Sequence, residues 1–379
     1  MDNQMLNRYY ENQVKMTQEE TSRNVAFVIP IVQDILTYVH QRDSRFKIQP
    51  FNVGSYYSHL KVKRADEFDY SVVLETGRLS WGNAPPEYFG YNEQTQEVER
   101  TSYQLPPSPV GMSTIYLNNI SSKWDEHGLN EGPGCLTIDG YIIPIKVKRR
   151  FKALVGEAVK RPSRKMKSVN AKRLTDSPAT TLKLSHPEIA GKEITVDLAP
   201  LIEGHAPFKA EFGWPRSSAR WPSQHKIEEI KAEGIHDVAK DPIYWTYSFV
   251  MCEKILLDGI DANETCRKKS QRIMKKLREI FCPSGMKQEL KSYHLKNILF
   301  WECENHPYDY EWGQDKLAER VQSMCELLIQ YIQSGNLPLY FHTGVNLFEK
   351  KDKHVLSIIC QKIFDFLENP ARCIDRLND

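Results

Sequence analysis

The sequence predicts an α+β protein with two lobes, a mixed-sheet lobe with a long N-terminal spine helix and then a helical lobe. Strand-like alternation of apolar and polar residues is concentrated between residues 67 and 198, whereas from Pro242 onward apolar residues recur at helical spacing. With 379 residues, 40% of them hydrophobic, the chain is long enough to bury a sizeable core. We expect the sheet lobe to span residues 1–205 and the helical lobe residues 206–379, with a ligand cleft between them.

The sheet lobe is predicted to open with a helix over residues 17–43, where apolar residues from Val25 to Val39 recur at helical spacing. Pro30 is expected to bend or break this helix because proline has no amide hydrogen to donate. Next we predict a turn with a short helix start at Gly54, a strand over 67–75, and a long surface insertion over 77–134 with one strand near 113–118. A strand over 135–145 and a basic helix over 147–160 follow, and the apolar side of that helix is formed by Phe151, Leu154 and Val155. The lobe ends with a mobile loop over 161–176 and strands over 179–185 and 193–198.

The helical lobe follows the same spacing argument. Its predicted helices cover residues 245–257, 266–281, 293–303, 316–334 and 354–367.

Charge is distributed unevenly along the chain. The net charge is +2, yet residues 141–175 hold twelve Lys and Arg against one acid, a net charge of +11, which leaves the remainder at −9. Residues 267–278 add seven basic residues and no acid. Basic runs of this density suit a polyanion, so we expect nucleic acid to bind there. The residues expected to contact it are Lys148, Arg149, Arg150, Lys152, Lys160, Arg161, Arg164, Lys165, Lys167, Arg267 and Lys268.

Compartment and metal content are also constrained by the residues. No apolar run approaches the roughly 18 residues of a membrane span, and the polar N-terminus is unlike a signal peptide, so a cytoplasmic protein without a membrane partner is expected. The eight cysteines are scattered without a Cys-x-x-Cys pair. They are read mostly as buried thiols, and no structural zinc is expected.

One constellation points to chemistry. Gly54 and Ser55 form a small-residue turn that could present amide hydrogens and a hydroxyl to phosphates, and Glu67 and Asp69 follow on a predicted strand. Strand side chains alternate between faces, so Glu67 and Asp69 point the same way, and Asp197 occupies a similar position on a later strand. Asp66, Asp139 and Asp176 lie in predicted loops or turns and suit the third position less well.

Three such carboxylates form an oxygen ligand set for Mg²⁺ or Mn²⁺. Two ions could stabilise an attacking hydroxyl and a departing pyrophosphate, which is nucleotidyl transfer. Other reactions have no matching motif in the chain: Gly-x-x-x-x-Gly-Lys-Ser/Thr, Gly-x-Gly-x-x-Gly, His-Glu-x-x-His and Gly-x-Ser-x-Gly are all missing.

The same residues resemble a known family. In order, the motifs are Gly54-Ser55-Tyr56-Tyr57-Ser58-His59-Leu60-Lys61 with Asp66-Glu67-Phe68-Asp69, Ser177 to Leu182, Ile194 to Leu198, Ser248-Phe249 with Glu253 to Leu256, the helix with Cys266-Arg267-Lys268 and Met274-Lys275, and Ser292-Tyr293-His294-Leu295-Lys296. This order, over roughly residues 17–350, resembles the animal cyclic GMP-AMP synthase and its cGAS-like receptors. The resemblance implies a bilobal nucleotidyltransferase fold.

The resemblance also implies roles for individual residues. Glu67, Asp69 and Asp197 would be the catalytic acids that bind two Mg²⁺ or Mn²⁺ ions, and Gly54 with Ser55 would hold the triphosphate. Tyr293 would stack on a nucleobase. The remaining implied nucleotide contacts are Ser177, Ser248, Lys275, Ser292 and Lys296.

Two departures from the family pattern bear on function. Between residues 257 and 266 the chain has a short loop with one cysteine, where the vertebrate enzyme has a zinc-binding thumb associated with double-stranded DNA. This resembles the invertebrate receptors, several of which respond to double-stranded RNA. Thr246 and Val250 replace an arginine and a serine near the acceptor base, so the bases and linkages of the product stay open.

The resulting expectation is an innate immune sensor that, on binding double-stranded RNA rather than double-stranded DNA, joins two nucleoside triphosphates such as ATP and GTP into a cyclic dinucleotide. The product would act on a STING-type receptor. Two alternatives remain: a catalytically inactive member with a binding or developmental role, and an enzyme that makes linear products like an oligoadenylate synthetase.

Overall fold

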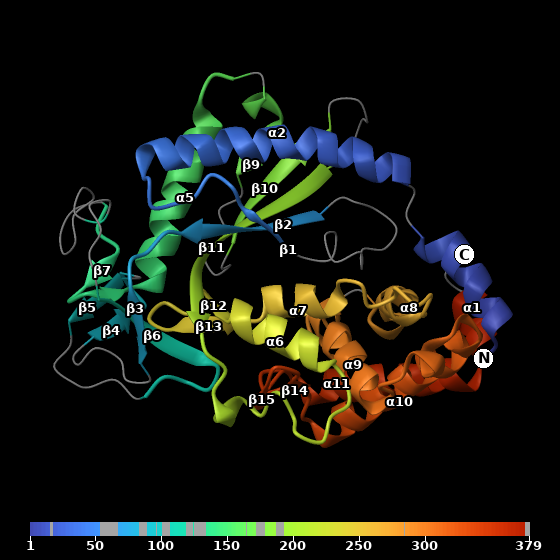
Figure 1. Ribbon diagram of the computed structural model, residues 1–379. Helices are drawn as coiled ribbons and strands as arrows, with labels where there is room; N and C mark the ends of the chain where they lie inside the picture. Colours follow the sequence, from blue (N-terminus) through green and yellow to red (C-terminus); the bar gives the residue numbers. More distant parts are fainter. Residues whose placement is uncertain are drawn as a thin grey trace.

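The computed structural model of the chain describes residues 1–15, 18–53, 67–82, 89–95, 97–100, 107–118, 124, 134–163, 165–171, 179–186, 193–283 and 285–375. Figure 1 shows a sheet crossed by a long helix, with a mass of helices on the other side of the molecule. The α+β class and the division into a sheet-bearing part and a helical part are confirmed.

The sheet is organised around one parallel pair of strands. β2 (Glu67–Leu74) and β11 (Glu193–Ala206) run parallel, aligned from Thr195 beside Glu67 to Ile202 beside Leu74. The strands that flank this pair are antiparallel to it: β1 (Phe51–Val53) beside β2, and β10 (Thr180–Ser185) and β12 (Ile235–Val238) beside β11, with β9 (Val169–Ala171) beyond β10. The sheet is therefore mixed, as predicted, and β11 lies at its centre.

Two helices cover one face of this sheet. α2 (Gln18–Arg42) crosses it along its length and packs on α5 (Pro144–Lys160). The apolar faces of the strands, predicted from their alternation, are buried here: Phe68, Tyr70 and Val72 from β2, and Ile194, Val196 and Leu198 from β11. Phe151, Leu154 and Val155 of α5 are buried against them, which confirms the predicted apolar side of that helix.

Pro30 does not break α2, contrary to one of the two expected outcomes. The proline lies on the exposed side of the helix, while Val28, Ile31 and Ile35 are buried on the other side. Because apolar burial on both sides of residue 30 holds the helix against the sheet, the missing amide hydrogen bond is tolerated.

The segment predicted as a surface insertion carries more strands than expected. Besides β6 (Met112–Leu117), which matches the prediction, it contains β3 (Leu79–Gly82), β4 (Phe89–Asn92) and β5 (Glu97–Arg100). β3 pairs with β6, and β4 pairs with β5 as a separate hairpin. The single strand predicted over 135–145 is a short hairpin of β7 (Thr137–Ile138) and β8 (Tyr141–Ile142), followed directly by α5.

The C-terminal part is helical with two strands at its start. Its helices are α6 (Gln224–Glu233), α7 (Val250–Leu257), α8 (Arg267–Phe281), α9 (Ser292–Asn305), α10 (Leu317–Ser334), α11 (Lys353–Glu368) and α12 (Pro370–Asp375). A small hairpin, β14 (Pro338–Leu339) with β15 (His342–Asn346), joins α10 to α11. The prediction of a helix from residue 245 was wrong at its start: β13 (Trp245–Ser248) pairs with β12 and β6 before α7 begins.

The first residues of the chain pack on the helical part. α1 (Asn3–Tyr9) and a π-helical turn, η1 (Tyr10–Val14), bury Leu6 and Val14 in the same apolar core as Ile273 and Met324. The core beneath α2 is a separate cluster drawn mainly from residues 28–202. No helix in the described ranges is both long and apolar enough to cross a membrane.

Candidate active site

Three predicted acids lie on one face of the central strand pair. Asp69 of β2 and Asp197 of β11 are aligned as direct neighbours, and Glu67 lies two residues earlier on β2, beside Thr195. Because strand side chains alternate, Glu67, Asp69 and Asp197 share the face opposite the buried residues Phe68 and Val196. Glu67 is exposed, and Asp69 and Asp197 are half-buried, so this face borders solvent.

A neighbouring hydroxyl orients one of these acids. Thr181 lies across from Asp197 on β10, and its Oγ1 donates a 2.6 Å hydrogen bond to Oδ1 of Asp197. Within the described residues, no group of three or more His, Cys, Asp and Glu side chains is gathered in a way that could hold a metal ion. The strand alignment places the acids together, while their side chains do not form a closed ligand set as they stand.

The chemistry of the donors suits a hard divalent cation. Carboxylates on adjacent strands supply the oxygen ligands that Mg²⁺ and Mn²⁺ prefer, with other positions left for water or phosphate. The predicted phosphate-binding residues Gly54 and Ser55, together with Ser177, lie outside the described residues. β1, whose Val53 precedes Gly54 and pairs with Asp69, is described and contacts α7 of the helical lobe.

A second group of predicted residues meets at the start of α9. Lys296 forms an ion pair with the buried carboxylate of Glu253 on α7, and its ammonium lies 5.1 Å from the centre of the Tyr293 ring. Burial, then the charge of Glu253 and a hydrogen bond to it, hold the pKa of the Tyr293 hydroxyl well above its usual range. Asn297 donates to the Tyr293 carbonyl oxygen at 2.9 Å. Tyr293, Lys296 and Glu253 therefore form one connected unit.

One residue of this unit, Glu253, was not among the predicted site residues. Glu253 is 3% exposed, and its burial beside a tyrosine and a lysine could not be read from a helix periodicity that only marks it as polar. The one signal for Glu253 in the sequence was its place in a motif shared with the family, Ser248-Phe249 with Glu253 to Leu256.

The other predicted nucleotide contacts occupy the surrounding elements. Ser248 ends β13, Ser292 is the exposed first residue of α9, and Lys275 is half-buried on α8 between the buried residues Ile273 and Leu277. The predicted nucleotide contacts thus lie on β13, α8 and α9. α8 and α9 share an apolar core with α7, and α7 contacts β1.

Part of the basic helix is used inside the protein. Arg150 pairs with Asp43 at 3.1 Å, and Arg161 pairs with Asp34 at 2.8 Å while its guanidinium lies 4.5 Å from the Tyr38 ring. Arg150 of α5 is thereby joined to the residue that follows α2, and Arg161, the residue that follows α5, is joined to α2. The other predicted nucleic-acid contacts of this region are half-buried at Lys148, Arg149 and Lys152 and exposed at Lys160, Lys165 and Lys167, while Arg164 lies outside the described residues.

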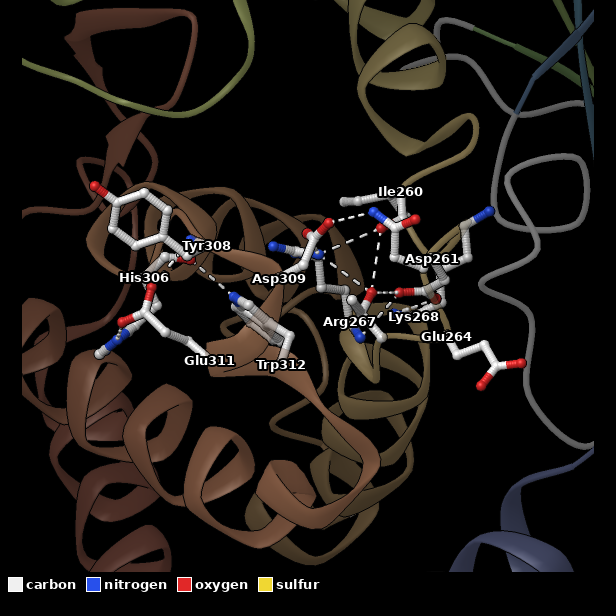
Figure 2. Close-up of polar contacts among 12 residues, drawn as sticks. Ile260, Asp261, Glu264, Arg267, Lys268, His306, Tyr308, Asp309, Glu311 and Trp312 are labelled. Carbon is white, nitrogen blue, oxygen red and sulfur yellow. Dashed lines mark hydrogen bonds and ion pairs between the residues drawn. The ribbon is translucent and has the colours of Figure 1, made fainter.

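The second basic run, α8, is largely covered. Arg267 is 1% exposed, pairs with Asp309 at 2.7 Å and lies 5.1 Å from the Trp312 ring, as Figure 2 shows. Lys269 and Arg272 donate to Asn7 and to the Tyr10 hydroxyl of the N-terminal segment, each at 2.6 Å. Arg267 was predicted to contact nucleic acid, but it is not part of an exposed basic face of α8, because it is buried and paired with Asp309.

The loop between α7 and α8 is closed by hydrogen bonds around Asp261. Its Oδ1 accepts from the Thr265 hydroxyl at 2.5 Å and from the Arg267 amide at 3.1 Å, and its Oδ2 accepts from the Lys268 amide at 3.1 Å (Figure 2). These contacts satisfy the first amides of α8. Cys266 is buried there, and burial raises the pKa of its thiol to about 11. All eight cysteines are free, and seven are buried, as predicted.

Comparison with known proteins gives one family for both halves of the chain. The sequence model of the Mab-21 protein nucleotidyltransferase domain matches residues 56–259, and that of the Mab-21 protein HhH/H2TH-like domain matches residues 266–365. Protein mab-21-like 3 of Danio rerio is 29% identical over 97% of this chain and 98% of its own length. Protein mab-21-like of Drosophila melanogaster is 25% identical over 95% of this chain and 91% of its own length.

Proposed function

The chain belongs to the Mab-21 family and contains its nucleotidyltransferase domain, and on this premise we propose that it joins two nucleoside triphosphates into a cyclic dinucleotide. In each of two steps, an acceptor hydroxyl attacks an α-phosphate, a phosphodiester bond forms and pyrophosphate leaves. The second step closes the ring between the same two nucleotides. ATP and GTP are the first substrates to test, and the product would act on a STING-type receptor.

The observation that carries this proposal is the alignment of Asp69 with Asp197. These two residues are direct neighbours on parallel strands, and Glu67 lies two residues from Asp69 on the same face. Three carboxylates therefore lie on one solvent-facing side of the sheet. Mg²⁺ or Mn²⁺ ions bound by these acids would supply charge stabilisation for the attacking and leaving oxygens. The hydrogen bond from Thr181 fixes the direction of Asp197, and either remaining acid can accept the proton of the acceptor hydroxyl.

The unit at the start of α9 supports a nucleotide beside these acids. Tyr293 offers a ring for a nucleobase, and Lys296 lies close enough to that ring to meet a phosphate or a base edge. The pairing of Lys296 with Glu253 holds the ammonium beside the ring. A bound nucleotide would compete with Glu253 for this lysine.

The proposed trigger is double-stranded RNA bound along α5 and the segment after it. Lys148, Arg149, Lys152, Lys160, Lys165 and Lys167 are the described residues that we assign to this contact. Duplex RNA is recognised mainly through phosphates and 2′-hydroxyls, which suits lysine and arginine on one helix side. Arg150 and Arg161 act indirectly, because they hold α5 against α2.

The test is product analysis with the full chain. Purified protein is incubated with labelled nucleoside triphosphates and Mg²⁺ or Mn²⁺, with and without duplex RNA or duplex DNA, and products are identified by mass spectrometry. Phosphatase-resistant product that depends on duplex RNA and is lost in Asp69→Asn supports the proposal. Linear oligomers would instead identify an oligoadenylate synthetase-like enzyme.

A binding role without catalysis is the second candidate. It is favoured by the finding that, among the residues described, no three acidic, histidine or cysteine side chains are gathered to hold a metal. Nucleotide binding without any turnover, unchanged in Asp69→Asn, would establish this role.

A further inference from the structure

Two tyrosines form an exposed stacked pair on the helical lobe. Tyr308 and Tyr310 are 40% and 75% exposed, and their rings lie 5.4 Å apart with only 11° between their planes. The guanidinium of Arg220 lies 6.0 Å from the Tyr308 ring, and its Nη1 donates to the Tyr308 hydroxyl. Two neighbouring rings in this arrangement leave a flat aromatic face in water on which another ring can stack.

The pair is held in place by the residues between and after it. Asp309 points the opposite way from Tyr308, toward Arg267, as Figure 2 shows. Asp309 also accepts from Asn263 at 2.5 Å. Glu311 accepts from the Tyr308 amide at 3.0 Å and contacts His306 at 3.1 Å. Alternate residues are therefore anchored inward, and the two rings are presented to solvent in a fixed arrangement, without an ordering cost on binding.

A pocket of about 270 Å³ lies next to the pair, lined by Arg220, Pro307 and Asp309 among others, although neither tyrosine lines it. Its walls include three cations, Arg220, Lys226 and Arg267, and two carboxylates, Asp258 and Asp309. Asp309 is neutralised by Arg267, Lys226 also contacts Glu229 at 3.0 Å, and the charge of Asp258 acts on Lys268. Arg220 is exposed and has no carboxylate partner among the residues that the structure describes.

Arg267 forms part of the pocket wall and is almost wholly buried. The Nη1 atom of the buried Arg267 donates to Asp309 at 2.7 Å, to the Thr265 hydroxyl at 3.2 Å and to the Ile260 carbonyl oxygen at 3.4 Å. Its Nε and Nη2 atoms have no hydrogen-bond partner in the described residues. Because these nitrogens are buried, the exposed cation Arg220 is the group that favours an anionic ligand such as a phosphate.

We propose that the tyrosine pair, Arg220 and this pocket together bind single-stranded nucleic acid. An unpaired base stacks on Tyr310, the next phosphate lies against Arg220, and the following sugar and phosphate enter the pocket. The pocket volume is below the range of about 300 to 1,000 Å³ typical of whole small-molecule sites. A base therefore remains outside, on the rings, where every base has a face to stack.

This surface is distinct from the duplex contact proposed on α5. A duplex keeps its bases stacked inside and presents only its backbone and grooves, so it cannot occupy the tyrosine pair. A single-stranded end or loop can reach both. The inference does not depend on catalysis, because it uses the tyrosine pair, Arg220 and the pocket walls and none of the three acids on the sheet.

The test is titration of the full chain against a fluorescein-labelled oligouridylate of about 12 nucleotides, followed by anisotropy. Tyr310→Ala is expected to weaken binding roughly tenfold, because base stacking on one ring is worth that much or more, whereas Tyr310→Phe keeps binding within about twofold. Arg220→Ala should weaken binding and reduce the salt dependence by about one phosphate contact.

The matched control is Phe364→Ala, which removes another exposed aromatic ring, 38% exposed, from α11. It should bind the oligouridylate as the wild type does. Tyr310 is exposed enough that Tyr310→Ala should melt within a degree or so of the wild type. Wild-type protein that does not bind the oligonucleotide, or equal affinity in Tyr310→Ala, overturns the proposal. Binding of a labelled proline-rich peptide in place of the oligonucleotide overturns it too.

A blunt-ended RNA duplex separates this proposal from the proposed function. Tyr310→Ala should bind the duplex normally, and a charge reversal on α5, Lys152→Glu, should bind the single strand normally. Loss of both ligands in either variant would show that the two surfaces are one, which overturns the proposal of a separate site.

Discussion

The hydroxyl of Thr181 on β10 donates a 2.6 Å hydrogen bond to Oδ1 of Asp197 on β11. Asp197 is therefore held between two strands, by this hydroxyl on one side and by its alignment with Asp69 on the other. Two neighbouring carboxylates repel each other until a cation binds between them. A fixed hydrogen bond limits how far Asp197 can turn away.

Thr181→Val tests this positioning role. The variant keeps the shape of the side chain and loses the hydroxyl, so Asp197 gains freedom to rotate. We expect cyclic dinucleotide formation to fall about tenfold, with the free energy of unfolding changed by only about 1 kcal/mol. Thr181→Ser should restore most of the activity. Full activity in Thr181→Val would show that the Thr181 hydroxyl does not position Asp197 for catalysis.

A buried ion network behind the sheet predicts a large stability effect. Asp43 and Arg45 are fully buried, with Arg45 Nη2 2.8 Å from Asp43 Oδ2, and Arg150 reaches the same carboxylate. Asp43→Ala leaves a buried guanidinium without its partner, so we expect a loss of about 3 to 5 kcal/mol in the free energy of unfolding by urea. The matched change Asp34→Ala, at the half-exposed pair with Arg161, should cost about 1 kcal/mol or less.

Asp237 predicts a pH dependence of stability. Burial raises its pKa from 3.8 to about 7, against the lowering effect of hydrogen bonds from Trp81 and Ser113. Between these two pH values the folded chain holds a proton that the unfolded chain has released. The free energy of unfolding therefore falls as pH rises from about 4 to about 7, by on the order of 1 kcal/mol per pH unit.

Asp237→Asn should remove this contribution. The urea midpoint of the variant minus that of the wild type should be larger at pH 8 than at pH 5. The reason is that at pH 8 the wild type must bury a charged carboxylate, whereas the amide of the variant carries no charge. The same wild-type-to-variant difference at both pH values would mean that Asp237 does not titrate in this range.

Charge reversal on α5 tests the duplex RNA surface. Lys152→Glu is expected to weaken duplex RNA binding several-fold to tenfold and to reduce its salt dependence, because each phosphate contact releases counterions. Lys226→Glu, the same charge change on α6 of the other lobe, is the control and should leave duplex binding unchanged in a filter-binding or anisotropy assay. Equal effects of both variants would point to net charge in place of a defined surface.

Local patterns in the sequence predicted much of the fold. Alternation at residues 68–72 and 194–198 identified the buried face of each central strand, because every second side chain of a strand points to the same face of the sheet. Helical spacing likewise identified α8 to α11 within a few residues. The same alternation assigned Glu67, Asp69 and Asp197 to the opposite face of their strands, and the family match confirms a nucleotidyltransferase domain.

Where local pattern is ambiguous, tertiary contacts decided the outcome. Trp245 to Ser248 has apolar residues that suit a helix, yet it pairs with β12 and β6, because a short run takes its conformation from its neighbours. Pro30 should interrupt a helix by local rules, and packing on the sheet kept α2 continuous. The basic run of α8 counts as a charged surface in the sequence, whereas Arg267 is buried against Asp309, 42 residues further on.

The sequence by itself determined which residues are apolar, which are charged and at what spacing they recur, and so which faces must be buried. Only the tertiary structure decided which strand lies beside which, and therefore that Asp197 neighbours Asp69 and that Glu253 meets Lys296. The physical reason is range: periodicity is a property of a few consecutive residues, while a partner across the sheet or between helices depends on how distant segments pack.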